Sequence, residues 1–546
     1  MHQHHERRRP VTEQLSPSGT EQNYVHGALD LFASISEREA LVGSGKRLSF
    51  GQLRESVLDT AARLRDYGVQ PGAAVLVMTA NVVEGPIVQL SLHLLGCRSM
   101  WVAPVTARRE ILEFAQLTTP DVFLYDSVNQ DAMGREVAAE LPGIPVLCIG
   151  GGGLGPDITA PLSDGQASWD LTTPTPLPES FLQTSGSTGT PKLVHHQHGF
   201  YAQILSLGAD FRAAGYPTLR HLGHSAMWLA SGQMTSLFNL FTGGDLFLRE
   251  EWDPAAFLAL VGAEKLNSTF CSPPMLYQVL DHPDLEQADF SSMFMFNVGA
   301  GPATPARLRQ AIARFGPCLR IVYGLSEAVV ITALPGLTDD PEHPDRIKSV
   351  GLPFGDVEIE IRSTVDGVSA SDGFDPGAVL PAGQTGEVWV RSKLSFSGYY
   401  GQPELTATTL VDGWVRTRDL GYLDADGYLY LVDRVHDMIV THRRNWAIFT
   451  RPIEDALAEH PAVTASAVIG VPDPVVGEVP WAFAVRAAGS DVSAEELIEL
   501  VTENLNDMYA PGGVTFVDEL PLNRSQKFDK QALRALWAAH VAGAPA

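Results

Sequence analysis

Apolar runs alternate with amphipathic segments along the first two thirds of the chain. Residues 73–78 form a continuous apolar run, which is typical of a buried strand. Residues 48–67 instead follow helical spacing, with Ser49 as a candidate N-cap and Gly68 as a stop. Strands that alternate with helices predict parallel sheets with helices on their faces.

The same alternation predicts most elements up to residue 323. Further strands are expected at residues 99–102, 121–125, 145–149, 180–182, 245–248, 268–271, 294–298 and 319–323. Further helices are expected at residues 24–38, 86–95, 111–117, 133–141, 200–211, 234–241, 254–262, 274–280 and 305–315.

The pattern changes after residue 350. Short alternating runs at residues 357–361, 386–390 and 428–432 are separated by Asp-Gly turns, which predicts antiparallel sheet or a small barrel. A mixed pattern of its own begins at about residue 434, with helices at 452–459, 493–505 and 530–539 and strands at 464–471, 482–486 and 513–516. We therefore expect an α/β protein in three parts. These are a tail (1–22), a large domain of parallel α/β sheets with a barrel-like part (23–433), and a small mobile α+β domain (434–546).

Composition limits the possible partners. With 45% hydrophobic and 19% charged residues over 546 positions, the chain can build large cores. A net charge of −26 argues against nucleic acid or an anionic membrane as the main partner. The four cysteines are far apart and form no CxxC pair, which predicts reduced thiols and a cytoplasmic protein. We find no apolar centre of a signal peptide and expect no membrane insertion.

One stretch carries clear chemistry. Residues 184–192 read Thr-Ser-Gly-Ser-Thr-Gly-Thr-Pro-Lys, so glycines, hydroxyls and a lysine lie together. Such a loop brings backbone N–H groups and a cation to an anion, and this predicts a polyphosphate site rather than a linker. The spacing is not that of a Walker A loop. Residues 150–155 match Gly-x-Gly-x-x-Gly, but two prolines and no helical period follow, so we interpret them as a surface loop.

Further motifs follow the loop in a fixed order. They are Tyr323-Gly324-Leu325-Ser326-Glu327, Thr417-Arg418-Asp419, Asp433-Arg434 and the segment from Pro521 to Lys527. Together with residues 184–192, this set resembles the superfamily of adenylate-forming ligases: acyl-CoA synthetases, peptide-synthetase adenylation domains and beetle luciferases. The resemblance covers nearly the whole chain after the first twenty residues. It implies an AMP-forming ligase that binds ATP and Mg²⁺.

The resemblance also implies a role for individual residues. The phosphates of ATP would be held by Thr184, Ser185, Gly186, Ser187, Thr188, Gly189 and Lys192. Gly299, Ala300 and Gly301 would lie against the adenine, and Tyr323, followed by Gly324, would stack on it. Ser326 would donate to the α-phosphate, Glu327 would hold Mg²⁺, Asp419 would accept from the ribose hydroxyls, Arg434 would reach the ribose or phosphates, and Lys527 would bridge the carboxylate and the α-phosphate. The chemistry agrees, because a carboxylate that attacks a phosphate needs cations to cancel the repulsion.

Several positions depart from the family pattern. Arg418 and Gln526 each replace a usual glycine, and His436 stands at the hinge position. Residues 441–446, Thr-His-Arg-Arg-Asn-Trp, replace a loop that usually reads close to Ser-Gly-Gly-Glu. In acyl-CoA synthetases that loop helps to form the pantetheine tunnel. The thioester step is therefore open: the basic residues would hold a phosphate of CoA or of a carrier arm, or would form a solvated turn.

The acid pocket is the least informative part of the sequence. Residues 221–233 align with the family's pocket helix, and Trp228 and Gly232 are the candidate pocket residues. No acidic residue lies in this stretch, which argues against an α-amino acid and favours an apolar or aryl acid. His195, His196 and His198 lack the spacing of a closed zinc site, so we interpret them as the entry to the next helix.

Four functions remain open from the sequence. The first is adenylation of a small organic acid followed by transfer to CoA, and the second is transfer to the thiol of a carrier protein. The third is a family member that makes no thioester, either an amide-forming enzyme or a diazotase that uses nitrite and an arylamine. The fourth is an inactive nucleotide-binding protein, against which Glu327, Asp419 and Lys527 speak.

Overall fold

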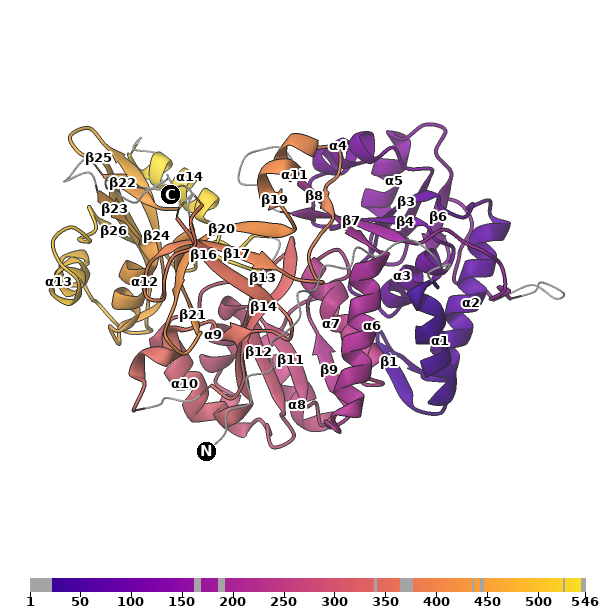
Figure 1. The fold of residues 1–546 in the computed structure, drawn as a ribbon, viewed down its shortest axis with the longest axis horizontal. Coiled ribbons are helices and arrows are strands. Elements are labelled where there is room, and N and C mark those ends of the chain that lie inside the picture. Colours follow the sequence, from indigo (N-terminus) through magenta and orange to yellow (C-terminus); the bar gives the residue numbers. More distant parts are fainter. Residues whose placement is uncertain are drawn as a thin grey trace, which may run out of the picture.

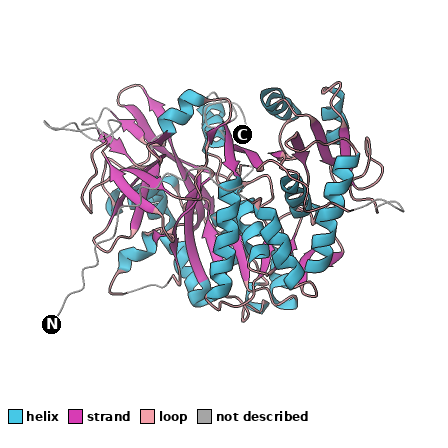
Figure 2. Ribbon diagram, turned by 45° about the vertical axis from the view of Figure 1, so that its right-hand side comes forward, coloured by secondary structure: helices cyan, strands magenta, loops and turns pink. Residues whose placement is uncertain are grey.

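The computed structural model describes residues 22–161, 168–184, 192–337, 341–363, 377–434, 437–441, 446–523 and 526–541. Figure 1 shows the C-terminal domain, in orange to yellow, at one end of the molecule. The indigo and purple N-terminal part lies at the other end, and the elements from α6 to β14 lie between them. Figure 2 shows helices lying along the strands of the large sheets. The α/β class predicted from the sequence is confirmed.

The first large sheet has the strand order β15-β14-β13-β12-β11-β9-β10-β1-β2. Neighbours from β1 to β13 pair in parallel, while β2, β14 and β15 are antiparallel. Its strands are β1 (Glu39–Gly43), β2 (Lys46–Ser49), β9 (Arg220–Gly223), β10 (Asp245–Leu248), β11 (Ser268–Cys271), β12 (Met295–Gly299), β13 (Leu319–Leu325), β14 (Ala328–Leu334) and β15 (Leu352–Pro353). The helices between them are α6 (His198–Ala213), α7 (Ala230–Phe241), α8 (Pro254–Ala263), α9 (Pro273–Leu280) and α10 (Pro305–Phe315).

The second large sheet has the order β18-β8-β7-β4-β3-β5-β6. Its strands are β3 (Ala74–Met78), β4 (Arg98–Val102), β5 (Val122–Asp126), β6 (Val146–Ile149), β7 (Glu179–Thr184), β8 (Lys192–Gln197) and β18 (Gly398–Tyr399). The helices of this part are α1 (Tyr24–Ser34), α2 (Phe50–Asp66), α3 (Glu84–Leu94), α4 (Arg108–Thr118) and α5 (Asp131–Ala139). All five residues of β3 are buried, as expected for a parallel strand covered on both faces. Helix α2 begins with the predicted Ser49 cap, which forms a capping box with Gln52.

Two smaller sheets follow. An antiparallel sheet with the order β16-β17-β20-β19, and with β21 beside β20, forms the barrel-like part. It contains β16 (Glu358–Arg362), β17 (Gly386–Arg391), β19 (Leu410–Val411), β20 (Trp414–Leu423) and β21 (Leu429–Arg434), with helix α11 (Pro403–Thr409) beside it. The C-terminal domain has β22 (Ile439–Thr441), β23 (Trp446–Ile448), β24 (Val463–Asp473), β25 (Gly477–Arg486) and β26 (Val514–Phe516), with α12 (Thr450–Ala458), α13 (Ala494–Asn504) and α14 (Lys530–Val541). Short 3₁₀ turns lie at Leu285–Gln287, Gly316–Cys318 and Pro344–Lys348.

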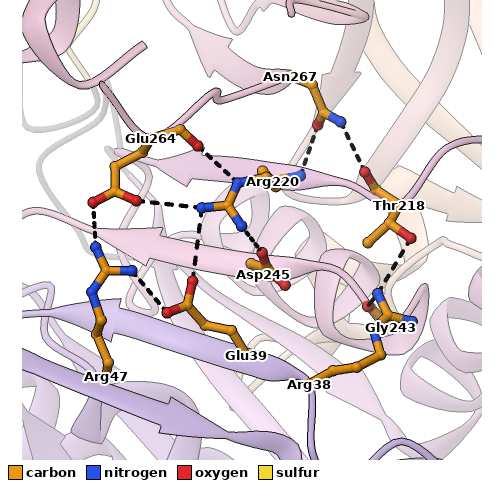
Figure 3. A network of polar contacts seen from close by, with 9 residues as sticks. All are labelled: Arg38, Glu39, Arg47, Thr218, Arg220, Gly243, Asp245, Glu264 and Asn267. Atoms are coloured by element: carbon orange, nitrogen blue, oxygen red, sulfur yellow. Dashed lines mark hydrogen bonds and ion pairs between the residues drawn. The ribbon is translucent and has the colours of Figure 1, made fainter. Parts of the chain in front are cut away.

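An ion-pair network links the hairpin of β1 and β2 to β9 and β10 within the first sheet (Figure 3). The Arg220 guanidinium on β9 pairs with Asp245 on β10 and lies 3.3 Å from Glu264 and 3.7 Å from Glu39. Arg47 on β2 pairs with the same two glutamates. Asp245 is only 6% exposed, and burial raises its pKa to about 6. Arg220 therefore supplies the charge that makes a buried carboxylate tolerable.

The structure corrects three expectations. Residues 220–223 form a strand and α7 begins only at Ala230, so the pocket segment 221–233 is a strand, a turn and one helical turn. His195 and His196 lie in β8 and not in a helix entry, although His198 does begin α6. Strands β1, β8 and β20 had no predicted counterpart, because polar residues or glycine interrupt their short apolar runs, and the apolar run of β14 was also not predicted as a strand.

Other expectations agree with the structure. Residues 150–155 form turns after β6 and open no helix. The cysteines, Cys97, Cys148, Cys271 and Cys318, are all buried and form no disulfide bond. No helix in the described part of the chain is long and apolar enough to cross a bilayer.

Candidate active site

A cavity of about 1400 Å³ extends along one face of the first sheet. Its floor follows the two-residue period of the strands: Arg320, Val322, Gly324 and Ser326 continue along β13, with Met295 and Asn297 on β12 and Ser268, Phe270 and Ser272 along β11. Helix α7 contributes one face, which consists of Ala230, Ser231, Met234, Thr235, Phe238 and Asn239. The predicted site residues Ala300, Gly324 and Ser326 thus lie near the carboxyl ends of parallel strands, where ligands bind in open α/β sheets.

The C-terminal domain contributes Lys527 to this same cavity, together with Leu522, Asn523 and Gln526. Hydrogen bonds between the two parts include the backbone N–H of Thr450 to Asp433 at 2.5 Å and Arg451 to the carbonyl of Leu431 at 3.0 Å, and Phe528, beside Lys527, packs against the core of the large domain. A residue more than 200 positions after Gly324 and Ser326 in the sequence therefore shares their cavity.

The environment of Lys527 changes its acidity. Removal from water, and then the Arg434 guanidinium, lower the pKa of Lys527 to about 8, while Asp419 and Glu327 oppose the shift. The low pKa means that the cavity lacks enough negative charge to balance the lysine. An anionic ligand would supply that charge.

Asp419 forms the centre of a second cluster. The carboxylate is 4% exposed and accepts from the Tyr323 hydroxyl at 2.6 Å and from Arg434 Nε at 3.0 Å. Strand pairing places it there, because Asp419 on β20 lies opposite Arg434 on β21. Burial, and then the Asp419 charge, raise the pKa of Tyr323 well above its usual value, so the phenol stays protonated and donates. The three residues predicted to hold the nucleoside are therefore brought together.

The loop predicted to bind phosphate, residues 184–192, begins and ends in two paired strands. Thr184 ends β7 and pairs with Lys192 at the start of β8, and the predicted strand at 180–182 lies within β7. Ser185, Gly186, Ser187, Thr188 and Gly189 lie outside the described residues. Lys192 Nζ is 5.8 Å from the centre of the Tyr399 ring.

Glu327 has a suitable environment for a divalent cation. Its Oε1 accepts from the Tyr399 hydroxyl at 2.6 Å, while Oε2 has no partner among the described residues. Burial and the Glu327 charge raise the pKa of Tyr399, which keeps it a donor. Mg²⁺ in phosphate sites is held by one or two carboxylates together with phosphate and water oxygens. A carboxylate held on one side only fits that requirement.

The sequence analysis missed two supporting residues. One is Tyr399, which orients Glu327. The other is His196, whose Nε2 lies 3.0 Å from the backbone carbonyl of Ser326. Burial lowers the pKa of His196 to about 3, so the ring is neutral and donates one N–H. No sequence motif marks a side chain that holds a backbone oxygen.

The backbone explains the family's glycines. Arg418 and Gln526, each at a usual glycine position, have φ of 63° and 56°. Ala300, between Gly299 and Gly301, has φ of 67°. At Gly324 an added Cβ would lie 2.0 Å from the carbonyl of Val329, so only glycine fits. Arg418 and Gln526 carry a backbone strain that glycine would avoid.

The remaining predicted positions are distributed as follows. Trp228 lines the cavity, and its indole N–H is buried without a partner among the described residues. Gly232 lies in α7 and packs against Ala226, where an added Cβ would be 1.9 Å from the carbonyl. It is therefore a packing position rather than a cavity-lining residue in the described structure. His436 and residues 442–445 lie outside the described residues.

Comparison with known proteins agrees with this geometry. The profile described as "AMP-binding enzyme" matches residues 33–400, and "AMP-binding enzyme C-terminal domain" matches residues 452–527. The chain belongs to the AMP-binding enzyme family. It is an AMP-forming ligase of the acyl-CoA ligase type.

Three relatives show the range of this family. A feruloyl-CoA synthase from Amycolatopsis is 32% identical over 90% of this chain and 94% of its own. A medium/long-chain-fatty-acid–CoA ligase from Mycobacterium tuberculosis is 36% identical, but the match covers only 54% of this chain and 50% of the relative. The structure of the amide bond synthetase McbA from Marinactinospora thermotolerans is similar with a TM-score of 0.82 and 31% identity, covering 94% of this AMP-binding enzyme and all of McbA.

Proposed function

We propose that this AMP-binding enzyme adenylates a carboxylic acid with an apolar or aryl body, and then transfers the acyl group to CoA. The observation that carries the proposal is the shared cavity, in which Lys527 of the C-terminal domain meets Ala300, Gly324 and Ser326 of the large domain. A cation brought to the carboxyl ends of these strands is placed to neutralise two anions that must react with each other.

In the first half-reaction, a carboxylate oxygen forms a bond to the α-phosphorus of ATP. The bond from that phosphorus to the bridging oxygen breaks, and pyrophosphate leaves. Lys527 neutralises the carboxylate and the α-phosphate, and Ser326 donates to the α-phosphate. Asp419, held by Tyr323 and Arg434, accepts from the ribose hydroxyls, and a carboxylate that keeps lone pairs free suits a diol.

The phosphates at the other end need further positive charge. In our proposal Lys192 and the loop before it receive the leaving pyrophosphate. Glu327 would hold Mg²⁺ through Oε2, and the ion would supply charge neutralisation on the phosphates. The hydroxyl of Tyr399 keeps the Glu327 carboxylate in place.

In the second half-reaction, the CoA sulfur forms a bond to the acyl carbon. The acyl carbon–oxygen bond breaks, AMP leaves, and the thiol proton goes to solvent. CoA is supported by the names of the relatives, among them feruloyl-CoA synthase and 4-coumarate–CoA ligase. Movement of the C-terminal domain about His436 would take Lys527 out of the cavity between the two steps.

A second acceptor is favoured by one comparison. The amide bond synthetase McbA is 31% identical over 94% of this chain, and residues 441–446 depart from the loop typical of CoA-dependent members. An amine would then displace AMP and form an amide. The acid-activating half of the proposal is the same for both acceptors.

Two measurements test the proposal. Exchange of labelled pyrophosphate into ATP, over a panel of aryl and aliphatic acids, reports adenylation without any acceptor. Silence with every acid contradicts the adenylation. Mass spectrometry of products formed with CoA, or with an amine panel, then identifies the acceptor, and an amide as the main product overturns the CoA assignment.

A further inference from the structure

The far end of the cavity carries a cation that no carboxylate of the described residues neutralises. Arg320 is the second residue of β13 and therefore lies at the edge of the sheet opposite Gly324 and Ser326. Its guanidinium lies 5.2 Å from the centre of the Phe294 ring, and it forms no ion pair within the described part of the chain. Its Nε is inaccessible to water and has no hydrogen-bond partner among the described residues. Arginine keeps its charge under such conditions.

A buried amide lies at the same edge of the sheet. Asn239 is 1% exposed and lines the cavity from the last turns of α7. Neither its Oδ1 nor its Nδ2 has a partner among the described residues. Helix α7 ends two residues later, and Gly243 and Gly244 lead directly to the start of β10. Because β10 and β13 belong to one set of parallel strands, Asn239 and Arg320 are at the same end of the sheet.

Aromatic rings connect the two sides of this region. Phe238 on α7 contacts Phe211, which contacts Tyr216, with ring centres 5.6 Å and 4.7 Å apart. Tyr216 in turn contacts Phe294 at 6.1 Å, and Phe294 lies under Arg320. All of these side chains line the cavity. The far end is thus an apolar, aromatic compartment with two groups that lack hydrogen-bond partners.

Such groups are costly to bury alone. A buried donor without a partner loses the hydrogen bonds that water would provide, as at the Asn239 amide and at Nε of the half-buried Arg320. An oxygen acceptor on an incoming ligand would give a partner to either group, and both groups line the same cavity. The length of the cavity limits where that acceptor can be on the ligand, because Arg320 and Gly324 are four strand residues, or ~13 Å, apart. Ser231 and Asn239 span a similar distance, ~12 Å, along α7.

We propose that the preferred acid is elongated and carries a second oxygen acceptor, best as a carboxylate, at the end opposite the reacting group, and that Arg320 and Asn239 bind it. The proposal rests on the proposed adenylation, since it assumes that the reacting carboxylate lies near Ser326 and Lys527. The aromatic rings would then contact the apolar middle of the acid.

Pyrophosphate exchange with matched acids tests the proposal in the unmodified enzyme. Each series has one chain length and ends in a methyl, a keto or a carboxylate group. We expect kcat/KM to rise from methyl to keto to carboxylate, with about 10- to 100-fold between the extremes, as for hydrogen bonds to charged groups. Equal values, or a preference for the methyl acids, overturn the proposal. Silence with every acid would instead refute the adenylation itself.

Variants assign the effect to the two side chains. Arg320→Met should remove the preference for the carboxylate acid and leave kcat/KM for the methyl acid unchanged or higher. Asn239→Ala should reduce the preference in the same direction. Arg314→Met is a control outside the cavity. Arg314 also lies over a ring, Phe290 at 5.3 Å, but it donates to the carbonyls of Leu285 and Ala288 and does not line the cavity, so the preference among the acids should stay unchanged. An equal loss for all three acids in Arg320→Met would show a purely structural role and refute the assignment.

Discussion

The acidity of Lys527 makes adenylation depend on pH in a defined direction. Its pKa is about 8, whereas an unperturbed lysine has 10.5. That difference corresponds to about 3 kcal/mol against the charged form in the ligand-free cavity. Only the charged form neutralises the reacting anions. Because kcat/KM reports the free enzyme, we expect kcat/KM for ATP in pyrophosphate exchange to fall tenfold per unit as pH rises above about 8.

Closure, the placement of Lys527 of the C-terminal domain in the cavity, should become more favourable as pH rises, which is opposite to the effect on adenylation. In the closed arrangement the lysine binds its proton less tightly than it does in water, so closure releases a proton. The cost of burying the charge is fully present below pH 8 and disappears as pH rises toward the unperturbed pKa of 10.5. Bound ATP adds negative charge, which raises the pKa of Lys527. The pH above which kcat falls should therefore be higher than the pH above which kcat/KM falls.

Substitutions identify the group that titrates. Lys527→Arg should abolish the fall in kcat/KM for ATP above pH 8, because arginine stays charged. The rate of this variant will be lower at every pH. Lys527→Ala should abolish exchange but spare transfer from supplied acyl-adenylate. Lys530→Arg is the control, since Lys530 pairs with Glu454 at 3.0 Å and its pKa is raised. An unchanged fall in kcat/KM in Lys527→Arg would refute the reasoning.

Three further predictions concern binding and stability. Asp419→Ala should lower kcat/KM for ATP about 10- to 100-fold in pyrophosphate exchange, because hydrogen bonds from the ribose hydroxyls to a charged group are lost. An unchanged KM for ATP would contradict the proposed binding of the ribose by Asp419. Arg418→Gly should raise the free energy of unfolding in urea by ~1 kcal/mol, because glycine tolerates the φ of 63° at this position. Arg418→Ala should give no gain, and equal effects of the two substitutions would rule out backbone strain as the cause. Arg220→Met should lower the free energy of unfolding by about 3–5 kcal/mol, because buried Asp245 is left unpaired. The double variant Arg220→Met/Asp245→Asn should recover part of this loss in thermal or urea unfolding, and an absence of recovery would count against the ion pair.

Local patterns predicted the parallel sheets well. Strand β11 and helix α10 have the bounds expected from the sequence, and Ser49 caps α2, because a buried run or a cap depends on neighbouring residues alone. Strand β20 was missed because polar and apolar residues mix along it, although it pairs with its sequence neighbours β19 and β21. Asp419, within that strand, meets Tyr323 96 positions away.

The candidate site followed from the motif order rather than from geometry. The motifs named Asp419, Glu327 and Lys527, but the partners that hold them came only with the fold. Tyr399 and His196 act on other residues and carry no motif of their own. The positive φ of Arg418 and Gln526 was also hidden, since an ordinary side chain at such a position gives no sign of the backbone it occupies.

The floor of the cavity has a consequence for how this family diversifies. One set of strands places Gly324 and Ser326 at its carboxyl ends and Arg320 toward its amino ends, so the proposed nucleotide and acid sites use different positions of the same strands. Selection can then alter which acid is accepted without rebuilding the nucleotide half. Enzymes named for ferulic acid, for fatty acids and for amide formation are about one third identical to this chain. Because the two functions lie at different positions of the same strands, substitutions toward the amino ends offer a physical route to that breadth.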